Sequence, residues 1–294
     1  MNVSALLTEV AGALPTTEGE SAHNVARTLI AAVLDQSWSA LRLAEREHST
    51  LSHHDVERVR LAARRLRTGM PFAYAAGTAA FRHLVLHVDD RVLIPRPETE
   101  IVVDHALRLM QRMPGGLAVD VGTGSGAIAL ALAQEGVFER VIGTDISADA
   151  LAVACLNGER VASSLRTPVE WRLGADLTPV HGLAVRLIVS NPPYIAFSEA
   201  SALPSSVRDW EPPTALFAAD NGMARYAELL RVAPALLEPG GWIVLECDST
   251  RAGETAALAE RLGTYDGVRV FDDLTGRARV LVAQRRTPWP PDAT

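Results

Sequence analysis

Four consecutive residues, Asn191, Pro192, Pro193 and Tyr194, have the types and the order that could position a planar amino group for chemistry. The lone pair of such an NH2 group is delocalised, so the nitrogen reacts poorly unless it is held in the right orientation. The Asn191 side-chain oxygen and the Pro192 carbonyl can each accept one N–H, and the proline rings stiffen the backbone that carries them. The ring of Tyr194 can stack on the planar group. The pattern favours group transfer to an amino nitrogen, with a strand-ending turn as the structural alternative.

A glycine-rich loop between a predicted strand and a predicted helix indicates a second partner in the reaction. The loop consists of Gly122, Thr123, Gly124, Ser125 and Gly126. Glycines permit a tight turn and a close approach of the backbone to a ligand. The spacing is GxGxG, whereas dinucleotide-binding proteins carry GxGxxG. Asp120 directly precedes the loop, and an acidic residue suits the cationic S-adenosylmethionine better than a pyrophosphate. Another nucleotide or a purely structural turn remain as alternatives.

Asp145 closes the next predicted strand, where its carboxylate can accept hydrogen bonds from both hydroxyls of a ribose. The glycine loop and Asp145 together therefore predict a nucleoside site.

The elements that must position these residues alternate between strand and helix. Strands are expected at 117–121, 140–144, 169–173, 187–190, 242–246, 268–271 and 278–282. Helical runs are expected at 128–133 and 223–237, with a turn at Pro239, Gly240 and Gly241. This alternation predicts an α/β fold with a mostly parallel, Rossmann-like seven-stranded sheet covered on both faces. Ligands of such sheets bind beyond the carboxyl ends of the strands, which is where both motifs fall.

The residues before this sheet predict a separate organisation. Apolar residues at helical spacing, for example Val3, Leu6, Leu7 and Val10, indicate a small helical domain over 1–75. Ser52 is expected to cap a helix whose arginines form either a solvated face or a docking surface for an acidic or RNA-bound partner. These arginines are Arg58, Arg60, Arg64, Arg65 and Arg67. A β-hairpin connector is predicted over 76–97, with its turn at Asp89 and Asp90, followed by the catalytic domain over 98–284 and a disordered tail over 285–294.

Composition excludes several classes of protein. The 294 residues are 48% hydrophobic and 21% charged, which is typical of a globular enzyme. The net charge of −7 disfavours a protein that wraps duplex DNA. No membrane span or secretion signal is expected, and two cysteines without CxxC spacing indicate the reducing cytoplasm. Cys155 is expected in a helix core and Cys247 after a buried strand. His83 and His87 lie on a predicted strand, so no metal site is expected.

At this point the chain resembles the peptide-chain release factor glutamine methyltransferases, the HemK/PrmC family, over nearly its whole length. The resemblance rests on the helical N-terminal region and on further shared segments. These are residues 71–74, 94–100, 120–126, Asp145, 191–194, 210–212, 219–222, 239–241 and 276–279. The segment from Ile94 to Glu100 separates this family from other amino-methyltransferases.

The resemblance implies methylation of the glutamine side-chain amide in the Gly-Gly-Gln loop of class I release factors. The loop from Gly122 to Gly126, Asp145 and Asn191 would contact S-adenosylmethionine, the motif from Asn191 to Tyr194 would hold the glutamine, and the N-terminal helices would grip the release factor. Asp176 would accept from the adenine amino group. Leu177 replaces the aromatic residue that often follows this acid, so stacking on adenine would be weaker.

Two departures and several alternatives remain open from the sequence. Residues 246–249 lack the glycine expected after the fifth strand, and Glu98 and Glu100 could line the cofactor pocket or be ordinary helix-start acids. An adenine or cytosine amino-methyltransferase acting on DNA or RNA would use the same logic on a flipped base, but no direct nucleic-acid substrate is expected of this acidic chain. A non-catalytic S-adenosylmethionine-binding protein and an NAD-dependent oxidoreductase are weaker alternatives.

Overall fold

The computed structural model describes residues 1–14 and 21–287, and its chain divides into two compact units. The smaller unit contains residues 1–79, 87–90 and 203–211, and the larger unit contains residues 80–86, 91–202 and the chain from 212 onward. Among the described residues, no helix combines the length and apolar character required to cross a membrane.

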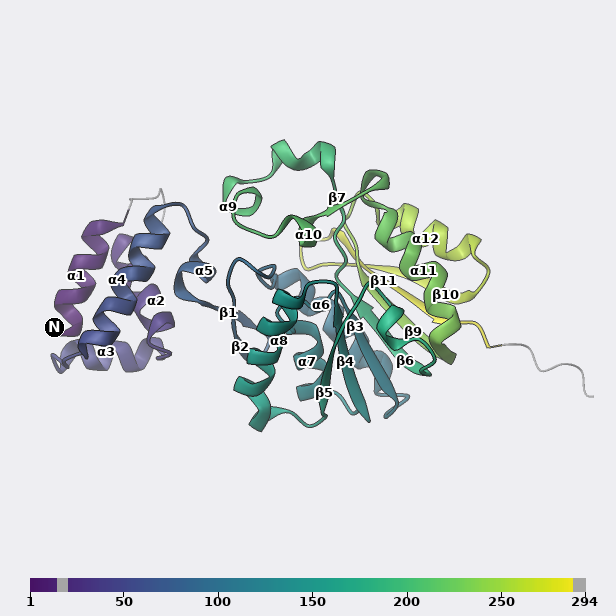
Figure 1. The fold of residues 1–294 in the computed structure, drawn as a ribbon, viewed down its shortest axis with the longest axis horizontal. Helices are drawn as coiled ribbons and strands as arrows, with labels where there is room; N and C mark the ends of the chain where they lie inside the picture. Colours follow the sequence, from purple (N-terminus) through teal and green to yellow (C-terminus); the bar gives the residue numbers. More distant parts are fainter. Residues whose placement is uncertain (15–20, 288–294) are drawn as a thin grey trace, which may run out of the picture. The chain divides into compact units, whose positions relative to one another are not determined.

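Helices build the smaller unit, as the apolar spacing predicted. They are α1 (Val3–Ala13), α2 (Ala22–Val33), α3 (Trp38–Arg46), α4 (His53–Arg67), α5 (Phe72–Ala76) and the short α9 (Ser205–Arg208) (Figure 1). The predicted apolar positions of α1 are all buried in the core of this unit. Ser52 caps α4 by accepting a hydrogen bond from the Asp55 N–H at 3.1 Å, which confirms the predicted start of this helix.

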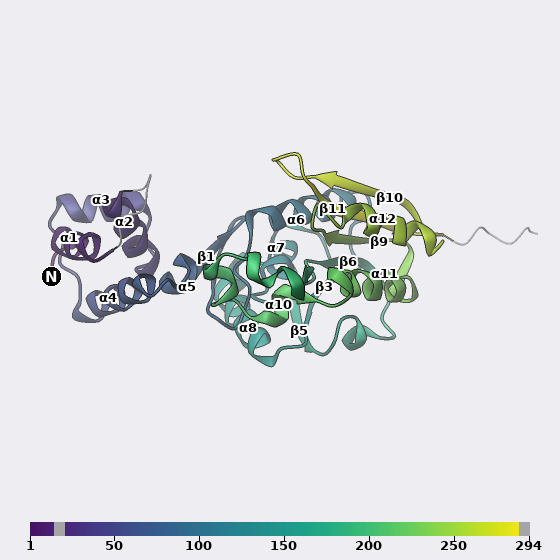
Figure 2. The ribbon, with the colours of Figure 1, turned by 90° about the horizontal axis from the view of Figure 1, so that it is seen from above.

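The larger unit contains a seven-stranded sheet in the order β10-β11-β9-β6-β3-β4-β5. The strands are β3 (Leu117–Val121), β4 (Arg140–Asp145), β5 (Val169–Leu173), β6 (Val185–Ser190), β9 (Leu237–Glu246), β10 (Tyr265–Asp272) and β11 (Ala278–Arg285). Neighbouring strands from β5 to β9 pair in parallel, and β11 pairs antiparallel with both β9 and β10 at one edge (Figure 2). The predicted mostly parallel sheet is confirmed.

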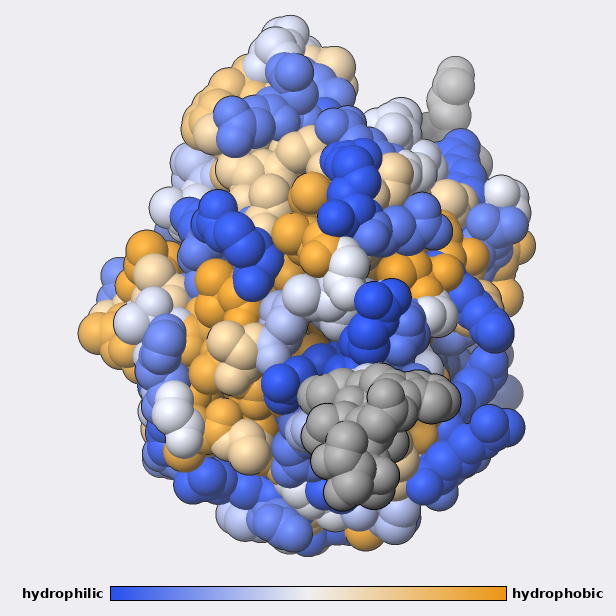
Figure 3. Space-filling view, turned by 90° about the vertical axis from the view of Figure 1, so that its right-hand side faces the viewer, coloured by the Kyte–Doolittle hydropathy of each residue, from blue (hydrophilic) through white to orange (hydrophobic). Residues whose placement is uncertain are grey.

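Alternate residues of the central strands enter two different cores, one on each face of the sheet. On one face, Val119 and Ile188 pack with residues of α11 (Ala224–Leu236) and α12 (Ala252–Arg261). On the other face, Ala118 and Leu187 pack with residues of α6 (Pro97–Met110) and α7 (Ala127–Glu135). The sheet is therefore covered on both sides, and the carboxyl ends of its parallel strands form a single edge. On the face shown in Figure 3, hydrophilic and hydrophobic areas are interspersed.

The predicted β-hairpin is present, but its turn lies elsewhere. β1 (Thr78–Phe81) pairs with β2 (Leu84–His87), so the chain reverses at Arg82 and His83 rather than at Asp89 and Asp90. At this turn Arg82 has a left-handed backbone with φ +53°, which is unfavourable for a residue other than glycine, and the hydrogen bond from its N–H to Glu100 Oε1 at 2.9 Å helps to hold it there. Alternation alone could not locate the turn, since it depends on a partner 18 residues away.

The Arg82 side chain links the hairpin turn to α6 and α7. It forms two bonds to the Glu135 carboxylate, at 2.6 and 2.8 Å, and one to Asp104 at 2.7 Å, while only 12% of the side chain is exposed. We expect Arg82→Ala to lower the free energy of unfolding by ~2 kcal/mol, because it leaves the half-buried Glu135 without its cation. Urea denaturation would measure this loss. The matched variant Arg286→Ala breaks an exposed ion pair with Asp266 and should change stability by less than ~0.5 kcal/mol. Equal free energies of unfolding for the two variants would contradict a stabilising role for the Arg82–Glu135 ion pair.

Several local features differ from the sequence predictions. The predicted turn at Gly240 lies inside β9, where Gly240 has φ +80° and the pairing with β6 skips several residues. Cys155 is exposed on α8 (Ala148–Val161), because the buried face of that helix carries Ala150, Val153, Ala154 and Asn157 instead. Cys247 is buried as predicted. Most of the predicted tail, residues 288–294, lies outside the described residues.

Candidate active site

The glycine loop follows β3 and leads into α7, and its conformation depends on its glycines. Gly122, Gly124 and Gly126 have φ values of +72°, +54° and +83°. The N–H groups of Gly122 and Thr123 both donate to the Thr144 carbonyl at 2.9 Å, and the Gly126 N–H donates to Thr123. These N–H groups therefore donate to carbonyls of the protein and are not available to bind a phosphate. This argues against a dinucleotide as the ligand.

Open space lies above two of these glycines. A Cβ atom built on Gly122 or Gly124 would meet no atom within 4 Å, so a ligand can approach the backbone there. Gly126, in contrast, packs against the Trp171 ring, which a Cβ would meet at 2.9 Å. The first two glycines leave room for a ligand, and the third allows close packing of the loop.

Asp120, near the end of β3, stabilises the glycine loop through hydrogen bonds. It is fully buried, and one carboxylate oxygen accepts from Thr123 Oγ1 at 2.6 Å and from the Ala129 N–H at 3.0 Å. Burial raises the pKa of Asp120 to about 7. Among the described residues, its other oxygen, Oδ1, has no hydrogen-bond partner. This orphaned acceptor fits a cationic ligand group or a bridging water.

Asp145, at the end of β4, lines the pocket and also organises its rim. Its Oδ2 accepts from the Gly124 N–H and its Oδ1 from the Ser147 N–H, both at 2.9 Å. Each carboxylate oxygen retains further acceptor capacity for ligand hydroxyls. The next residue, Ile146, lines the same pocket with 62% of its surface exposed, and it offers an apolar wall that sequence reasoning missed.

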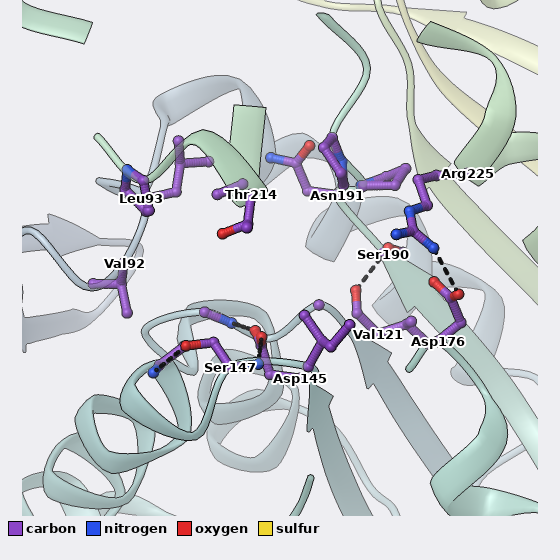
Figure 4. A pocket seen from close by; sticks show the side chains of 18 of the residues that line it. Val92, Leu93, Val121, Asp145, Ser147, Asp176, Ser190, Asn191, Thr214 and Arg225 are labelled. Carbon is purple, nitrogen blue, oxygen red and sulfur yellow. Dashed lines mark hydrogen bonds and ion pairs between the residues drawn. The ribbon is translucent and has the colours of Figure 1, made fainter. Parts of the chain in front are cut away.

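A pocket with about 840 Å³ of open space lies beyond the carboxyl ends of β3, β4 and β6. In Figure 4, Asp145 and Ser147 lie on one side of this space, and Asn191 and Thr214 lie on the other. Of the predicted site residues, those that line the pocket are Gly122, Gly124, Asp145, Asp176, Asn191, Pro192 and Pro193. Those that lie outside its wall are Thr123, Ser125, Gly126, Leu177 and Tyr194.

Asp176 lies at one end of the pocket, paired with Arg225 of α11 at 2.9 Å (Figure 4). Leu177, predicted to pack weakly on a ligand ring, is instead 1% exposed and belongs to a hydrophobic core of the sheet. The reason is local, because Asp176 has φ +48° and the chain then enters a short 3₁₀ turn that directs Leu177 inward. Leu177 therefore supports the fold rather than the pocket.

Asn191 follows β6, is partly buried, and is linked by hydrogen bonds to two buried polar side chains, Thr99 and Glu246. Its Nδ2 donates to Thr99 Oγ1 at 3.1 Å, and the Thr99 hydroxyl donates to Glu246 Oε2 at 2.6 Å. Thr99 is in the first turn of α6 and Glu246 ends β9, so α6, β6 and β9 meet at this point. The arrangement orients the carboxamide of Asn191 in the pocket wall.

Tyr194 is partly buried and packs against a hydrophobic core. Burial raises the pKa of its hydroxyl well above the ordinary value. The following strand β7 (Ile195–Ala196) pairs with β8 (Phe217–Ala218), and a 3₁₀ turn at Asp220–Gly222 lies behind it. A Cβ on Gly222 would lie 2.1 Å from the Tyr194 carbonyl oxygen. Only glycine can occupy this position without moving Tyr194.

We expect Gly222→Ala to displace the backbone at Tyr194. The variant should lose ~2–3 kcal/mol of folding free energy and at least ~5-fold in turnover, since small displacements of positioned groups are costly. Gly263→Ala is the matched control, because Gly263 has a comparable φ of +66° but no atom within 4 Å of its Cβ position. It should lose only ~1 kcal/mol and keep its turnover. Melting and activity assays on both variants check this, and similar behaviour of the two would exclude the steric argument.

The loop after β9, which lacks the expected glycine, is organised by Arg251. The Arg251 guanidinium, 12% exposed, bonds to Asp248 at 3.2 Å, to the Asn221 carbonyl at 2.6 Å and to Glu199 at 2.7 Å. It thereby connects this loop to the turn behind Tyr194. Glu100, one of the two helix-start acids, binds the hairpin turn and is not among the pocket-lining residues.

Sequence reasoning missed part of the pocket wall, namely Arg91, Val92, Leu93, Ser147, Thr214, Arg225 and Leu229. The exposed apolar Ile146 directly after the strand-ending Asp145 was a usable signal. Apart from Ser147, which follows Ile146 directly, the other residues come from segments distant in sequence, and their side-chain types indicate no particular chemistry.

Comparisons with known proteins agree with this fold. A family model described as the methyltransferase small domain matches residues 100–203. A solved methyltransferase from Pyrococcus furiosus has a TM-score of 0.51 at 17% identity, covers 70% of this chain and 91% of its own, and supports the fold alone. The protein is an S-adenosylmethionine-dependent methyltransferase.

Relatives define the family more closely. A release factor glutamine methyltransferase from Moorella thermoacetica is 38% identical over 245 residues, which cover 83% of this chain and 86% of the relative. Another from Rhodopirellula baltica is 39% identical over 228 residues, or 76% of each chain. The chain belongs to the release factor glutamine methyltransferase family.

Proposed function

We propose that this protein transfers a methyl group from S-adenosylmethionine to the side-chain amide nitrogen of the glutamine in the Gly-Gly-Gln motif of class I release factors. Family membership supports the substrate class. The observation that carries the chemistry is the oriented carboxamide of Asn191, which lies in the wall of a pocket whose opposite side holds Asp145.

In this proposal the cofactor lies along the strand ends and supplies an activated methyl group. Asp145 accepts from the ribose hydroxyls, Gly122 and Gly124 allow the backbone to approach closely, and Ile146 packs against the adenine. Asp176, already paired with Arg225, offers its remaining oxygen to the adenine amino group. Asp120 holds the glycine loop in the conformation that leaves room for the cofactor, because its carboxylate accepts hydrogen bonds from the Thr123 hydroxyl and the Ala129 N–H.

The residues of the motif hold the glutamine amide. Asn191 Oδ1 and the Pro192 carbonyl each accept one of its N–H bonds, so the nitrogen lone pair is aimed at the methyl carbon. Pro192 and Pro193 stiffen the backbone that carries these acceptors. Tyr194 packs against the hydrophobic core outside the pocket wall, and Gly222 lies against its carbonyl, so in this proposal Tyr194 fixes the end of the motif and its ring does not stack on the amide. No strong base is required, because the proton can leave after methyl transfer.

We propose the helical unit as the docking domain for the release factor. Two arginines of α4 are engaged within that unit, Arg58 with Asp55 and Arg60 with Glu9 and Glu57. For Arg64, Arg65 and Arg67 the part of the chain that the structure describes provides no ion-pair partner, so they are the candidates to meet an acidic face of the substrate.

The alternative substrate class is a flipped adenine or cytosine, which presents the same planar NH2 group. Incubation with radiolabelled S-adenosylmethionine and either a release factor, DNA or RNA separates the two. We expect label in the release factor alone. Label in a nucleic acid, with none in the release factor, would refute the proposed substrate.

A further inference from the structure

We propose that Thr99 and Glu246 are positioning residues that determine which end of the Asn191 carboxamide faces the substrate. The inference rests on the proposed function, because it assigns a task to the oxygen of Asn191. It adds to the motif a second layer, drawn from α6 and β9, that is distant in sequence.

The three groups form one continuous chain of hydrogen bonds that runs from the pocket wall, at Asn191, to two buried side chains. Asn191 Nδ2 lies 3.1 Å from Thr99 Oγ1, which lies 2.6 Å from Glu246 Oε2. Thr99 is 4% exposed and Glu246 is 1% exposed. Water therefore cannot readily replace either partner, and the hydrogen bonds of the chain must be satisfied within it.

When Glu246 is ionised, each hydrogen bond from Asn191 through Thr99 to Glu246 has only one possible donor. An ionised carboxylate only accepts, so the Thr99 hydroxyl must donate its single hydrogen to Glu246. The Thr99 oxygen can then only accept, and only the NH2 end of the Asn191 amide can donate to it. The carbonyl end, Oδ1, is thereby turned to the pocket, where it can accept an N–H from a glutamine amide.

Protonation of Glu246 removes this constraint. A protonated Glu246 can donate to Thr99, whose hydrogen can then bind Asn191 Oδ1, and the rotated amide presents its NH2 group to the substrate. Burial raises the pKa of Glu246 to about 7, so the ionised form is lost as the pH falls through this value.

Other groups act on the same carboxylate from the surrounding elements. Arg279 of β11 and Arg96, just before α6, favour its ionised form, whereas Glu98 of α6 opposes it. The Tyr194 hydroxyl also lies within its electrostatic reach. The balance of these charges leaves Glu246 as a group that can change its protonation near neutral pH.

The first arm of the test removes the hydroxyl without changing the volume. Thr99→Val should lower kcat about 10-fold at saturating cofactor, with an unchanged Kd for S-adenosylmethionine by calorimetry. Thr99→Ser, which restores the hydroxyl, should recover kcat to within about 3-fold of the original protein. Thr255→Val is the matched control, since Thr255 is also buried but its hydroxyl donates to the carbonyl of Arg251, the N-cap of its own helix α12. It should keep its kcat.

The second arm uses the pH dependence of kcat. The original protein should lose turnover as the pH falls from about 8 to about 6, whereas Glu246→Gln, which keeps an acceptor but does not titrate, should be nearly flat over this range. If kcat of Glu246→Gln still fell with pH over this range, the fall would have to come from another titrating group, such as Asp120. That result would overturn the inference.

The proposed function and this inference fail in different ways. If the original protein does not label a release factor, the proposed function itself is wrong. If it labels the release factor and Thr99→Val does so at the same kcat, only the positioning role is refuted. A loss in Thr99→Val that Thr99→Ser does not recover would likewise count against the hydroxyl.

Discussion

Asn191→Ala is expected to lower the rate of methyl transfer at least ~10²-fold. The substitution removes the side-chain oxygen that accepts one N–H of the substrate amide, and losing one preorganised acceptor at a transition state typically costs this much. It also leaves Thr99 without its donor. The rate should be measured in single turnovers at saturating S-adenosylmethionine, so that a change in cofactor affinity does not enter.

Two controls isolate the chemistry in this experiment. Calorimetry should show that the variant still binds the cofactor, and thermal unfolding should show an intact fold. Methyl transfer at a near-normal rate by Asn191→Ala would remove this residue from the mechanism.

Asp145→Ala is expected to raise the Kd for S-adenosylmethionine at least ~10²-fold. The carboxylate is proposed to accept from the ribose, and charged hydrogen bonds of this kind contribute ~1.5–3 kcal/mol each. Asp145 also holds the Gly124 N–H and the Ser147 N–H, so the rim of the pocket loses its anchor. Turnover of the saturated complex should fall less than ~10-fold, because the residue does not contact the reacting atoms.

Asp149→Ala provides the comparison for this variant. Asp149 lies in the first turn of α8, close in sequence to Asp145, and is exposed. Its loss should leave the Kd within about 2-fold. If Asp145→Ala lowered turnover strongly while the cofactor still bound normally, the ribose role would have to be abandoned.

The sheet could be predicted because its signals are local. Short apolar runs separated by helical segments identified the strands, and the parallel arrangement follows from that alternation. The glycine loop, Asp145 and Asn191 were also within reach, since each directly follows a strand and the strand ends share one edge. They line the same pocket because the carboxyl ends of parallel strands lie at the same edge of the sheet.

Other features depend on distant partners and could not be found this way. The hairpin turn at Arg82 is held by Glu100, and the inward orientation of Leu177 follows from the left-handed backbone of Asp176. Arg225 enters the pocket from α11 only because that helix packs on the sheet. No periodicity in the sequence encodes these contacts.

The structure also accounts physically for two segments that the resemblance identified only as patterns. Within the segment from Ile94 to Glu100, Thr99 holds Asn191 and Glu100 holds the hairpin turn. Within the segment from Ala219 to Gly222, the last residue leaves room for the Tyr194 carbonyl. Both segments therefore act on the motif indirectly, through its backbone or its amide orientation.

Mass spectrometry of a class I release factor after incubation with S-adenosylmethionine and this protein detects the proposed product itself. We expect the mass of one added methyl group on the glutamine of the Gly-Gly-Gln peptide, and we expect that mass to be absent when Asn191→Ala replaces the original protein. A Gly-Gly-Gln peptide that stays unmodified, while the protein methylates another residue or a nucleic acid, would contradict the proposed function.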